Sequence, residues 1–181
     1  MDTLEKRYKE KIASELQQKL GISNIMAIPA MKKIVVNMGV KDAVLDKKNV
    51  TKAVDVMTQI TGQKPKVVKS KKSIATFKLR EGDPIGVVVT LHGRRMYEFF
   101  EKIIAIVLPR IKDFHGVSRT SFDGHGNYAL GFSEYSVFPE IDLSTVDRIQ
   151  GLEVIVVTNS ETDDKGFALM EALGIPFAKK S

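Results

Sequence analysis

A dense group of basic side chains between residues 64 and 80 is the part of this sequence best suited to binding a charged ligand. The stretch KPKVVKSKKSIATFKLR carries seven Lys or Arg and no acidic residue. Like charges this close repel one another, and phosphate groups would relieve the repulsion while releasing counterions. The stretch therefore predicts a polyanionic partner. A solvated lysine-rich loop with no partner is the alternative.

Histidines near turns are the main candidates for catalysis. Asp123 and His125 lie two residues apart in FDGHGNY, and His92 precedes Arg94 and Arg95. A hairpin turn explains the first pair without chemistry, and no nucleophile elbow, HExxH, Walker A or GxGxxG motif is present. Three His, no Cys and no clustered pair of carboxylates leave metal and acid–base catalysis little to work with. We expect a protein that is not an enzyme and that holds no metal or cofactor.

Length and composition indicate one ordinary globular domain. The 181 residues are 43% hydrophobic and 28% charged, and we expect a single domain over 1–181. No apolar run approaches the roughly 20 residues that span a bilayer, so no membrane partner is expected. The charged N-terminus lacks an apolar signal-peptide core. With no cysteine to form disulfides, a reducing cytoplasm is the simplest location.

The distribution of charge suggests two kinds of partner. The net charge is +6, yet residues 133–181 hold nine acidic and four basic side chains. A positive first half and a negative end suggest one polyanionic and one basic partner. A dipolar surface with nothing bound at the acidic end is equally compatible.

Hydrophobic periodicity predicts the elements that position these groups. We expect helices over 3–20, 49–61, 94–107 and 161–173, strands over 33–40, 65–70, 85–92 and 152–158, and a hairpin arm over 121–138. Pro109 is expected to stop the third helix. The fold class is α+β: a single two-layer domain with a mostly antiparallel sheet of about five strands, helices on one face, an open concave face and a long basic β-hairpin-like loop.

Two polar residues and one long loop are the functional features of this arrangement. Asn37 and Thr90 have the parity opposite to the apolar residues of their strands, which places both on the open face. The protruding basic loop over 70–84 could reach about 20–25 Å at roughly 3.3 Å per residue. RNA is favoured over duplex DNA because no recognition-helix pattern appears. No RNP-like motif occurs, so shape and backbone contacts are expected rather than a stacking platform on the sheet.

Several longer motifs resemble one family. KIVVNMGV, ITGQKPKVVKSKKSIATFKLREGDPIGVVVTLHGRRMYEFFEKI, LPRIKDFHGV, SFDGHGNYALGFSEYSVFPEID and GLEVIVVT resemble the family of bacterial large-subunit ribosomal protein five. The resemblance covers essentially the whole chain. It departs at Ala75-Thr76, where Ala-Gly is expected.

The resemblance implies a non-enzymatic protein that holds 5S rRNA in the central protuberance of the large ribosomal subunit. The implied partners are 5S rRNA, 23S rRNA, the P-site tRNA, a basic small-subunit protein in an intersubunit bridge, and neighbouring 5S-associated ribosomal proteins. The implied rRNA-binding residues are Asn37, Gln63, Lys64, Lys66, Lys69, Thr90 and Arg94. The implied tRNA-contacting loop residues are Lys71, Lys72, Ser73, Thr76, Lys78 and Arg80. The implied bridge residues are Arg110, Lys112, Asp113, Glu134, Glu140 and Asp142.

Two other functions stay open at this point. The main alternative is a non-specific RNA-binding module or RNA chaperone, which would bind any structured RNA of equal length with similar affinity. The other is an RNA-modifying or RNA-cleaving enzyme that uses His92 or His125, whose turnover would be lost on substitution of one histidine by alanine.

Overall fold

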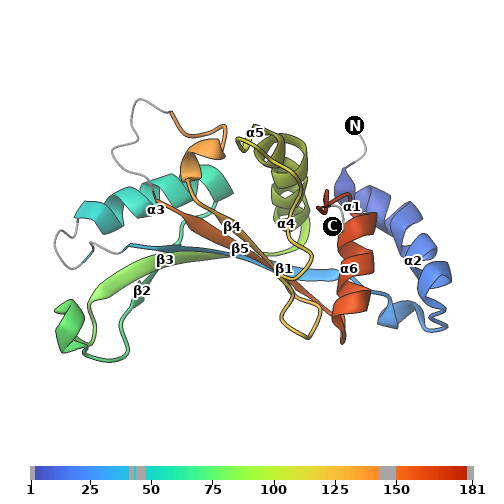
Figure 1. Cartoon of the computed structure of the whole chain (residues 1–181), viewed down its shortest axis with the longest axis horizontal. Coiled ribbons are helices and arrows are strands. Elements are labelled where there is room, and N and C mark those ends of the chain that lie inside the picture. The colour runs from blue at the N-terminus through green and yellow to red at the C-terminus, as the bar shows by residue number, and fades with distance from the viewer. Residues whose placement is uncertain (1–2, 41–42, 44–47, 143–149, 179–181) are drawn as a thin grey trace. The chain divides into compact units, whose positions relative to one another are not determined.

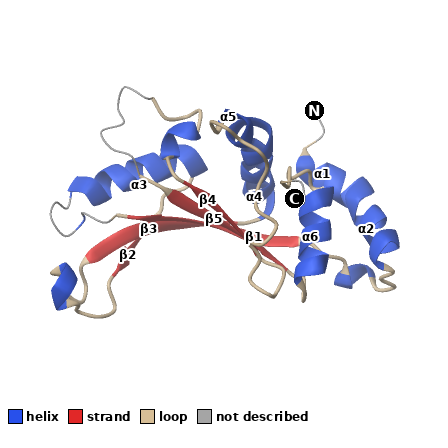
Figure 2. Cartoon of the chain, viewed as in Figure 1, coloured by secondary structure: helices blue, strands red, loops and turns tan. Residues whose placement is uncertain are grey.

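The computed structural model describes residues 3–40, 43, 48–142 and 150–178, and in them the chain has an α+β fold (Figures 1 and 2). One sheet runs in the order β2-β3-β1-β5-β4. Its strands are β1 (Met31–Gly39), β2 (Lys66–Lys69), β3 (Pro84–Leu91), β4 (Tyr128–Phe132) and β5 (Leu152–Thr158). The predicted sheet of about five strands is confirmed.

Neighbouring strands run antiparallel. β2 pairs antiparallel with β3, with Lys66 opposite Val88 and Val68 opposite Gly86. The backbone N–H of Val40, just past the end of β1, donates to the Ile85 carbonyl at the start of β3, at 2.8 Å. The sheet is thus the predicted antiparallel one, and it stays open rather than closing into a barrel.

The helices lie close to their predicted positions. The first helical segment runs without a break through α1 (Leu4–Arg7), the π-helical turn η1 (Tyr8–Ile12) and α2 (Ala13–Leu20), and the second helix is α3 (Lys48–Thr61). The others are α4 (Gly93–Lys102), the π-helical turn η5 (Ile103–Val107), α5 (Leu108–Arg110) and α6 (Asp163–Ala172). Short 3-10 turns are η2 (Ile25–Ala27), η4 (Ala75–Phe77) and η6 (Tyr135–Val137).

The third helical segment does not end where the sequence predicts. Pro109 is expected to stop it at Val107, but the helix continues to Arg110. The wide turn η5 comes just before the proline, and Pro109 falls at the first positions of α5. Val107 and Leu108 are both helical, so Pro109 lies inside a continuing helix rather than at a free helix start. The hydrogen-bond ladder widens in the π-helical turn just before the proline, which is where a helix adapts to a missing N–H.

The predicted hairpin arm over 121–138 is shorter than expected. Only Tyr128–Phe132 forms a regular strand, and its predicted partner arm reduces to one antiparallel bridge between Phe122 and Tyr128. The turn itself is present, closed by a 3.3 Å hydrogen bond from the Asp123 N–H to the Asn127 carbonyl.

Backbone contacts divide the chain into two compact units. Unit 1 comprises Met1–Ile34, Leu91–Leu130 and Ile155–Ser181, and unit 2 comprises Val35–Thr90 and Gly131–Val154. The boundary between the units falls inside four strands, β1, β3, β4 and β5. The single domain over 1–181 therefore stays a prediction.

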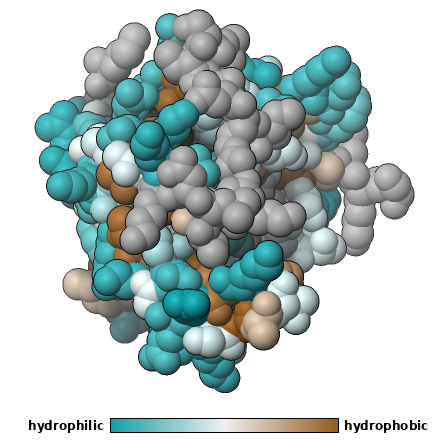
Figure 3. Space-filling model, turned by 90° about the vertical axis from the view of Figure 1, so that its left-hand side faces the viewer, coloured by the Kyte–Doolittle hydropathy of each residue, from teal (hydrophilic) through white to brown (hydrophobic). Residues whose placement is uncertain are grey.

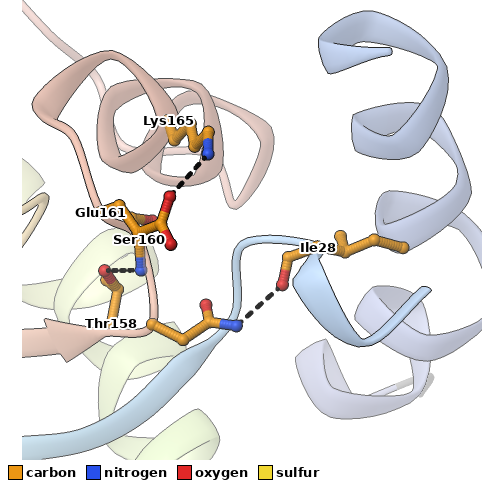
Figure 4. A network of polar contacts seen from close by, with 6 residues as sticks. Ile28, Thr158, Ser160, Glu161 and Lys165 are labelled. Carbon is orange, nitrogen blue, oxygen red and sulfur yellow. Dashed lines mark hydrogen bonds and ion pairs between the residues drawn. The ribbon is translucent and has the colours of Figure 1, made fainter. Parts of the chain in front are cut away.

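The helices of unit 1 pack against one another. α1 contacts α4, and α2 contacts α6. Asn159, just after β5, holds the segment before β1. Its side-chain amide donates to the Ile28 carbonyl at 3.0 Å (Figure 4). Its side-chain oxygen accepts from the Ala30 N–H at 2.6 Å. Figure 4 also shows Thr158 accepting from the Ser160 N–H at 3.0 Å. These bonds fix the entry to β1 against the exit from β5.

Unit 2 is built from strands covered on one face by α3 (Figure 1). The face toward α3 is apolar, with Val36, Met38, Val87 and Val89 at or near zero exposure, together with Met57 of the helix. Within the described part of unit 2, α3 is the one α-helix, so no α-helix of this unit covers the opposite face of its strands. That uncovered side is called the open face below.

Candidate nucleic-acid interface

Two polar side chains lie on the open face of unit 2, as the alternation of the strands predicts. Asn37 is half-buried between buried Val36 and Met38, and Thr90 is half-buried between buried Val89 and Leu91. Within the described part of the chain, neither the Asn37 amide nor the Thr90 hydroxyl makes a side-chain hydrogen bond. Polar groups that are partly desolvated and unpaired are ready to bond an external ligand.

The end of α3 places Gln63 beside the end of β3. Gly62 takes φ +66°, a left-handed conformation that suits glycine, and its N–H donates to the Thr58 carbonyl at 2.9 Å. The Thr61 hydroxyl donates to the Met57 carbonyl at 2.7 Å and accepts from the Gln63 N–H at 3.3 Å. The Gln63 side chain then donates to the Thr90 carbonyl at 3.2 Å. Two residues distant in sequence are thus adjacent at the edge of the open face.

Basic side chains border this edge. Lys66 lies opposite Val88 in the β2–β3 ladder, so both side chains share one face of the sheet, whereas Val67 lies opposite buried Val87 on the other. Because Val88 shares the parity of Thr90, Lys66 belongs to the open face. Lys64 and Lys69 are close by in sequence, and Lys69 is exposed.

The predicted basic loop is a hydrogen-bonded hairpin that extends from β2 and β3 (Figure 1). Its base is closed by two hydrogen bonds, from the Ser70 N–H to the Asp83 carbonyl at 2.8 Å and from the Gly82 N–H to the Ser70 carbonyl at 3.0 Å. Its tip is closed by two more between Ile74 and Leu79, at 2.9 and 3.1 Å. The loop residues predicted to contact tRNA are all exposed: Lys71, Lys72, Ser73, Thr76, Lys78 and Arg80.

The substitution of threonine for the expected glycine fits this turn. Thr76 lies in the 3-10 turn η4, and the left-handed residue of the tip is Lys78, with φ +51°. Thr76 therefore does not need the conformational freedom of glycine.

The cations of the loop differ from those of the first helix in their partners. None of the seven basic residues between 64 and 80 makes an ion pair in the described part of the chain. In the first helix, by contrast, Lys9 pairs with Glu5 at 2.7 Å and Lys11 with Glu15 at 3.8 Å. The positive charge of the loop is left available for a ligand.

The remaining predicted site residues are distributed over both units. Arg94, predicted with the rRNA set, belongs to unit 1, where its guanidinium pairs with Glu98 at 2.7 Å. The predicted bridge residues Arg110, Lys112 and Asp113 lie in unit 1, whereas Glu134, Glu140 and Asp142 are exposed in unit 2. The six predicted bridge residues therefore form two groups, one in each unit, and each group is considered by itself.

The residues considered for catalysis have structural roles or no arrangement that supports chemistry. The Asp123 carboxylate accepts the backbone N–H of His125 at 2.9 Å and of Asn127 at 3.1 Å, and the Asn127 side chain at 2.6 Å. The Asn127 side chain is the largest cause of a lowered Asp123 pKa, and the two backbone donors act in the same direction. The Asp123–His125 spacing therefore belongs to a turn, as the sequence suggests. The described residues contain no group of His, Asp or Glu that could hold a metal ion.

One further basic residue shares the open-face parity. Lys33, four residues before Asn37 on β1, is half-buried, and it is absent from the residues predicted from the sequence. The strand alternation that identified Asn37 is the signal that could have found it. Lys33 belongs to unit 1, so it is not counted with the open face of unit 2.

An uncovered sheet face with unpaired polar groups, bordered by unpaired cations and without catalytic residues, is typical of a non-enzymatic nucleic-acid-binding protein. Two family models match the chain: Ribosomal protein L5 over residues 24–80, and the C-terminus of the ribosomal L5 family over residues 84–177. The chain therefore belongs to the L5 (uL5) family of ribosomal proteins, which confirms the resemblance noted in the sequence.

Similar curated proteins cover the chain almost from end to end. It is 54% identical over 177 residues to the large ribosomal subunit protein uL5 of Francisella tularensis subsp. mediasiatica (strain FSC147), covering 98% of this chain and 99% of that protein. It is 49% identical over 179 residues to the protein of the same name from Thermoanaerobacter sp. (strain X514), covering 99% and 100%. The family is structural rather than enzymatic and is located in the cytoplasmic ribosome, as the sequence predicts. None of the described helices is long and apolar enough to cross a membrane.

Proposed function

We propose that this chain is a structural protein of the large ribosomal subunit that binds 5S rRNA through the open face of unit 2. It helps to attach that RNA in the central protuberance, next to 23S rRNA and the other proteins associated with 5S rRNA. Membership of the uL5 family supports the ribosomal setting. The choice of face is supported by the unpaired Asn37 and Thr90 side chains, which is the observation that carries the proposal.

The open face combines the two kinds of contact that RNA recognition uses. The cations at Lys64, Lys66 and Lys69 supply attraction to phosphates that does not depend on sequence. The Asn37 amide and the Thr90 hydroxyl can donate and accept hydrogen bonds with 2′-hydroxyls or base edges. Gln63 uses one donor on the Thr90 carbonyl and keeps its side-chain oxygen for a ligand. Shape and polar contacts of this kind add specificity to the electrostatic attraction.

The basic loop is proposed to contact a second RNA, the tRNA in the P site. The loop extends away from β2 and β3, so its exposed cations are separated along the chain from the open face (Figure 1). Its unpaired lysines and arginine suit the tRNA backbone. Ser73 is engaged within the loop, where its hydroxyl accepts from the Glu81 N–H at 2.9 Å, and we propose that it shapes the loop.

The acidic exposed residues of unit 2 are proposed to face a basic small-subunit protein across an intersubunit bridge. Glu134 accepts a hydrogen bond from the Ser136 hydroxyl at 2.8 Å, and Glu140 and Asp142 are exposed nearby in sequence. Charges of this kind steer association more than they set affinity. A second segment, with Arg110, Lys112 and Asp113, is proposed to contact the same small-subunit protein.

Substitution of Thr90 and Asn37 tests the proposed face. We expect Thr90→Ala and Asn37→Ala each to weaken 5S rRNA binding by about tenfold, because each removes a polar contact worth about 1–3 kcal/mol. Affinities would be measured by filter binding with the purified full-length protein, after circular dichroism has shown that each variant is folded.

Thr51→Ala is the matched control for Thr90→Ala. Thr51 is an exposed residue of α3, which covers the other face of the strands. This variant is expected to bind 5S rRNA as tightly as the unaltered protein. Unchanged binding by both Thr90→Ala and Asn37→Ala would assign 5S rRNA to a different surface.

A further inference from the structure

The tip of the basic loop presents an aromatic side chain to solvent. Phe77 is 71% exposed, and it is the one aromatic residue among the large, strongly exposed hydrophobic residues of the described chain. Its ring contacts no other ring and no cation in that part of the structure. Leaving a Phe side chain in water forgoes about 1.5–3 kcal/mol of burial. The Phe77 ring is therefore available for burial against a partner.

The loop holds Phe77 in this position through a hydrogen-bonded turn. The Phe77 N–H donates to the Ile74 carbonyl at 3.3 Å, and the Lys78 N–H donates to the Ala75 carbonyl at 3.0 Å. Lys78 adopts φ +51°, a left-handed conformation that costs a side-chain-bearing residue on the order of 1–2 kcal/mol. The turn tolerates this cost at Lys78, and the Phe77 ring next to it lies in solvent outside the hairpin. The exposure of Phe77 is therefore a feature of a defined backbone geometry.

The surroundings of Phe77 indicate what its partner is. Lys71, Lys72, Lys78 and Arg80 are exposed on the same hairpin and make no ion pair in the described residues. Figure 3, which views the molecule from the side of the loop, shows hydrophobic residues in brown among hydrophilic ones in teal. Protein interfaces are depleted in lysine at their apolar centres, so a protein pocket is a poor match. An aromatic ring among cations is the combination that binds an unpaired base and its flanking phosphates.

We propose that Phe77 stacks on an unpaired base of the RNA that the loop contacts. The cations of the loop hold the phosphates on either side, and the ring covers one face of the base. Stacking tolerates any base, because every base has a π-face. This inference rests on the proposed contact of the loop with tRNA and adds to it the residue and the mode of contact. It is independent of the 5S rRNA contact at the open face.

A tryptophan at position 77 provides a direct test. The chain contains no Trp, so Phe77→Trp in the full-length protein carries a single indole whose fluorescence reports only on the loop tip. We expect tRNA to quench this emission strongly, in step with binding measured on the same samples by filter retention. Ile106→Trp is the control: Ile106 is 43% exposed on the turn η5, outside the loop, and the emission of this variant is expected to change little.

Affinity variants at the same position give a second readout. Phe77→Tyr keeps a stacking ring and is expected to bind tRNA within about twofold of the unaltered protein, whereas Phe77→Leu keeps the hydrophobicity without the ring and is expected to bind about tenfold more weakly. A merely hydrophobic contact would tolerate leucine as well as tyrosine.

Each outcome decides the matter. Quenching at position 77 together with the Tyr–Leu difference supports stacking. Binding of tRNA without quenching overturns the stacking and leaves the loop–tRNA contact intact. Absence of tRNA binding overturns both, while 5S rRNA binding would still stand on the open face. A blue shift in the emission of the Phe77→Trp variant on anionic phospholipid vesicles, without quenching by RNA, would assign the tip to a membrane surface instead.

Discussion

Replacement of Lys71, Lys72 and Lys78 together by Gln is expected to weaken tRNA binding by about 100-fold at about 0.1 M salt. These three cations are exposed and make no ion pair within the described residues, so none of their charge is neutralised inside the chain. Each phosphate contact contributes about 0.9 to the slope of log affinity against log salt, so the slope should become shallower by about 2–3. Filter-binding titrations of tRNA over a range of salt concentrations measure both quantities.

A triple variant of the first helix controls for net charge. Lys9, Lys11 and Lys19 pair with Glu5, Glu15 and Glu171, and their replacement by Gln changes the net charge of the protein by the same amount. This control should lose little affinity for tRNA, and the loop variant should keep most of its affinity for 5S rRNA. Equal losses in the two triple variants would show that total charge, rather than the loop, binds tRNA.

The variant Gly86→Ala is expected to lose about 3 kcal/mol of unfolding free energy. A Cβ added at Gly86 would lie 2.7 Å from the Met38 carbonyl oxygen and 3.3 Å from Gly39 Cα. Both atoms belong to the backbone of β1, so relief requires moving a strand of the sheet rather than turning a side chain. The backbone hydrogen bond from Val40 to Ile85, beside this contact, would be disturbed as well.

Gly39→Ala is the matched control for that substitution. Gly39 lies on the neighbouring strand of the same unit, and a Cβ there meets nothing within 4 Å. Its effect should stay within about 0.5 kcal/mol. Urea unfolding followed by circular dichroism would compare the two variants, and equal stabilities would mean that β1 and β3 are not as close at Gly86 as described.

Strand positions and faces could be predicted well from the sequence. The strand predicted over 152–158 is β5 to the residue, because its apolar run has clear ends. The parity argument that placed Asn37 and Thr90 opposite the apolar set holds as well, since burial alternates along β1 and the second half of β3. Alternation depends only on local geometry, so a single strand is enough to reveal it.

Features that depend on distant parts of the chain could not be predicted in this way. The hydrogen bond from Gln63 to Thr90 joins residues 27 apart and requires the left-handed Gly62 at the end of α3. The continuation of the third helix past Pro109 depends on the π-helical turn before it, for which hydrophobic periodicity gives no signal. The ion pair of Arg94 with Glu98 has the i, i+4 spacing of a helix, which occurs so often by chance that the sequence alone does not distinguish a paired Arg94 from an RNA contact.

The exposure of Phe77 illustrates a further limit. Phe77 lies between Ile74 and Leu79 in the sequence, and hydrophobic residues spaced in this way are typical of a partly buried strand. Only the hairpin bonds and the left-handed Lys78 show that the ring lies outside. Local composition cannot distinguish a hydrophobic residue that is buried from one that is presented.

Comparison of two RNAs tests the central claim most directly. The purified protein would be titrated with 5S rRNA and with a structured control RNA of the same length, each at about 0.1 and 0.3 M salt. Polar and shape contacts on the open face predict a preference for 5S rRNA that persists at the higher salt, while the shared electrostatic attraction declines. Equal affinities that fall together as salt rises would contradict specific 5S rRNA binding and leave a non-specific RNA-binding protein.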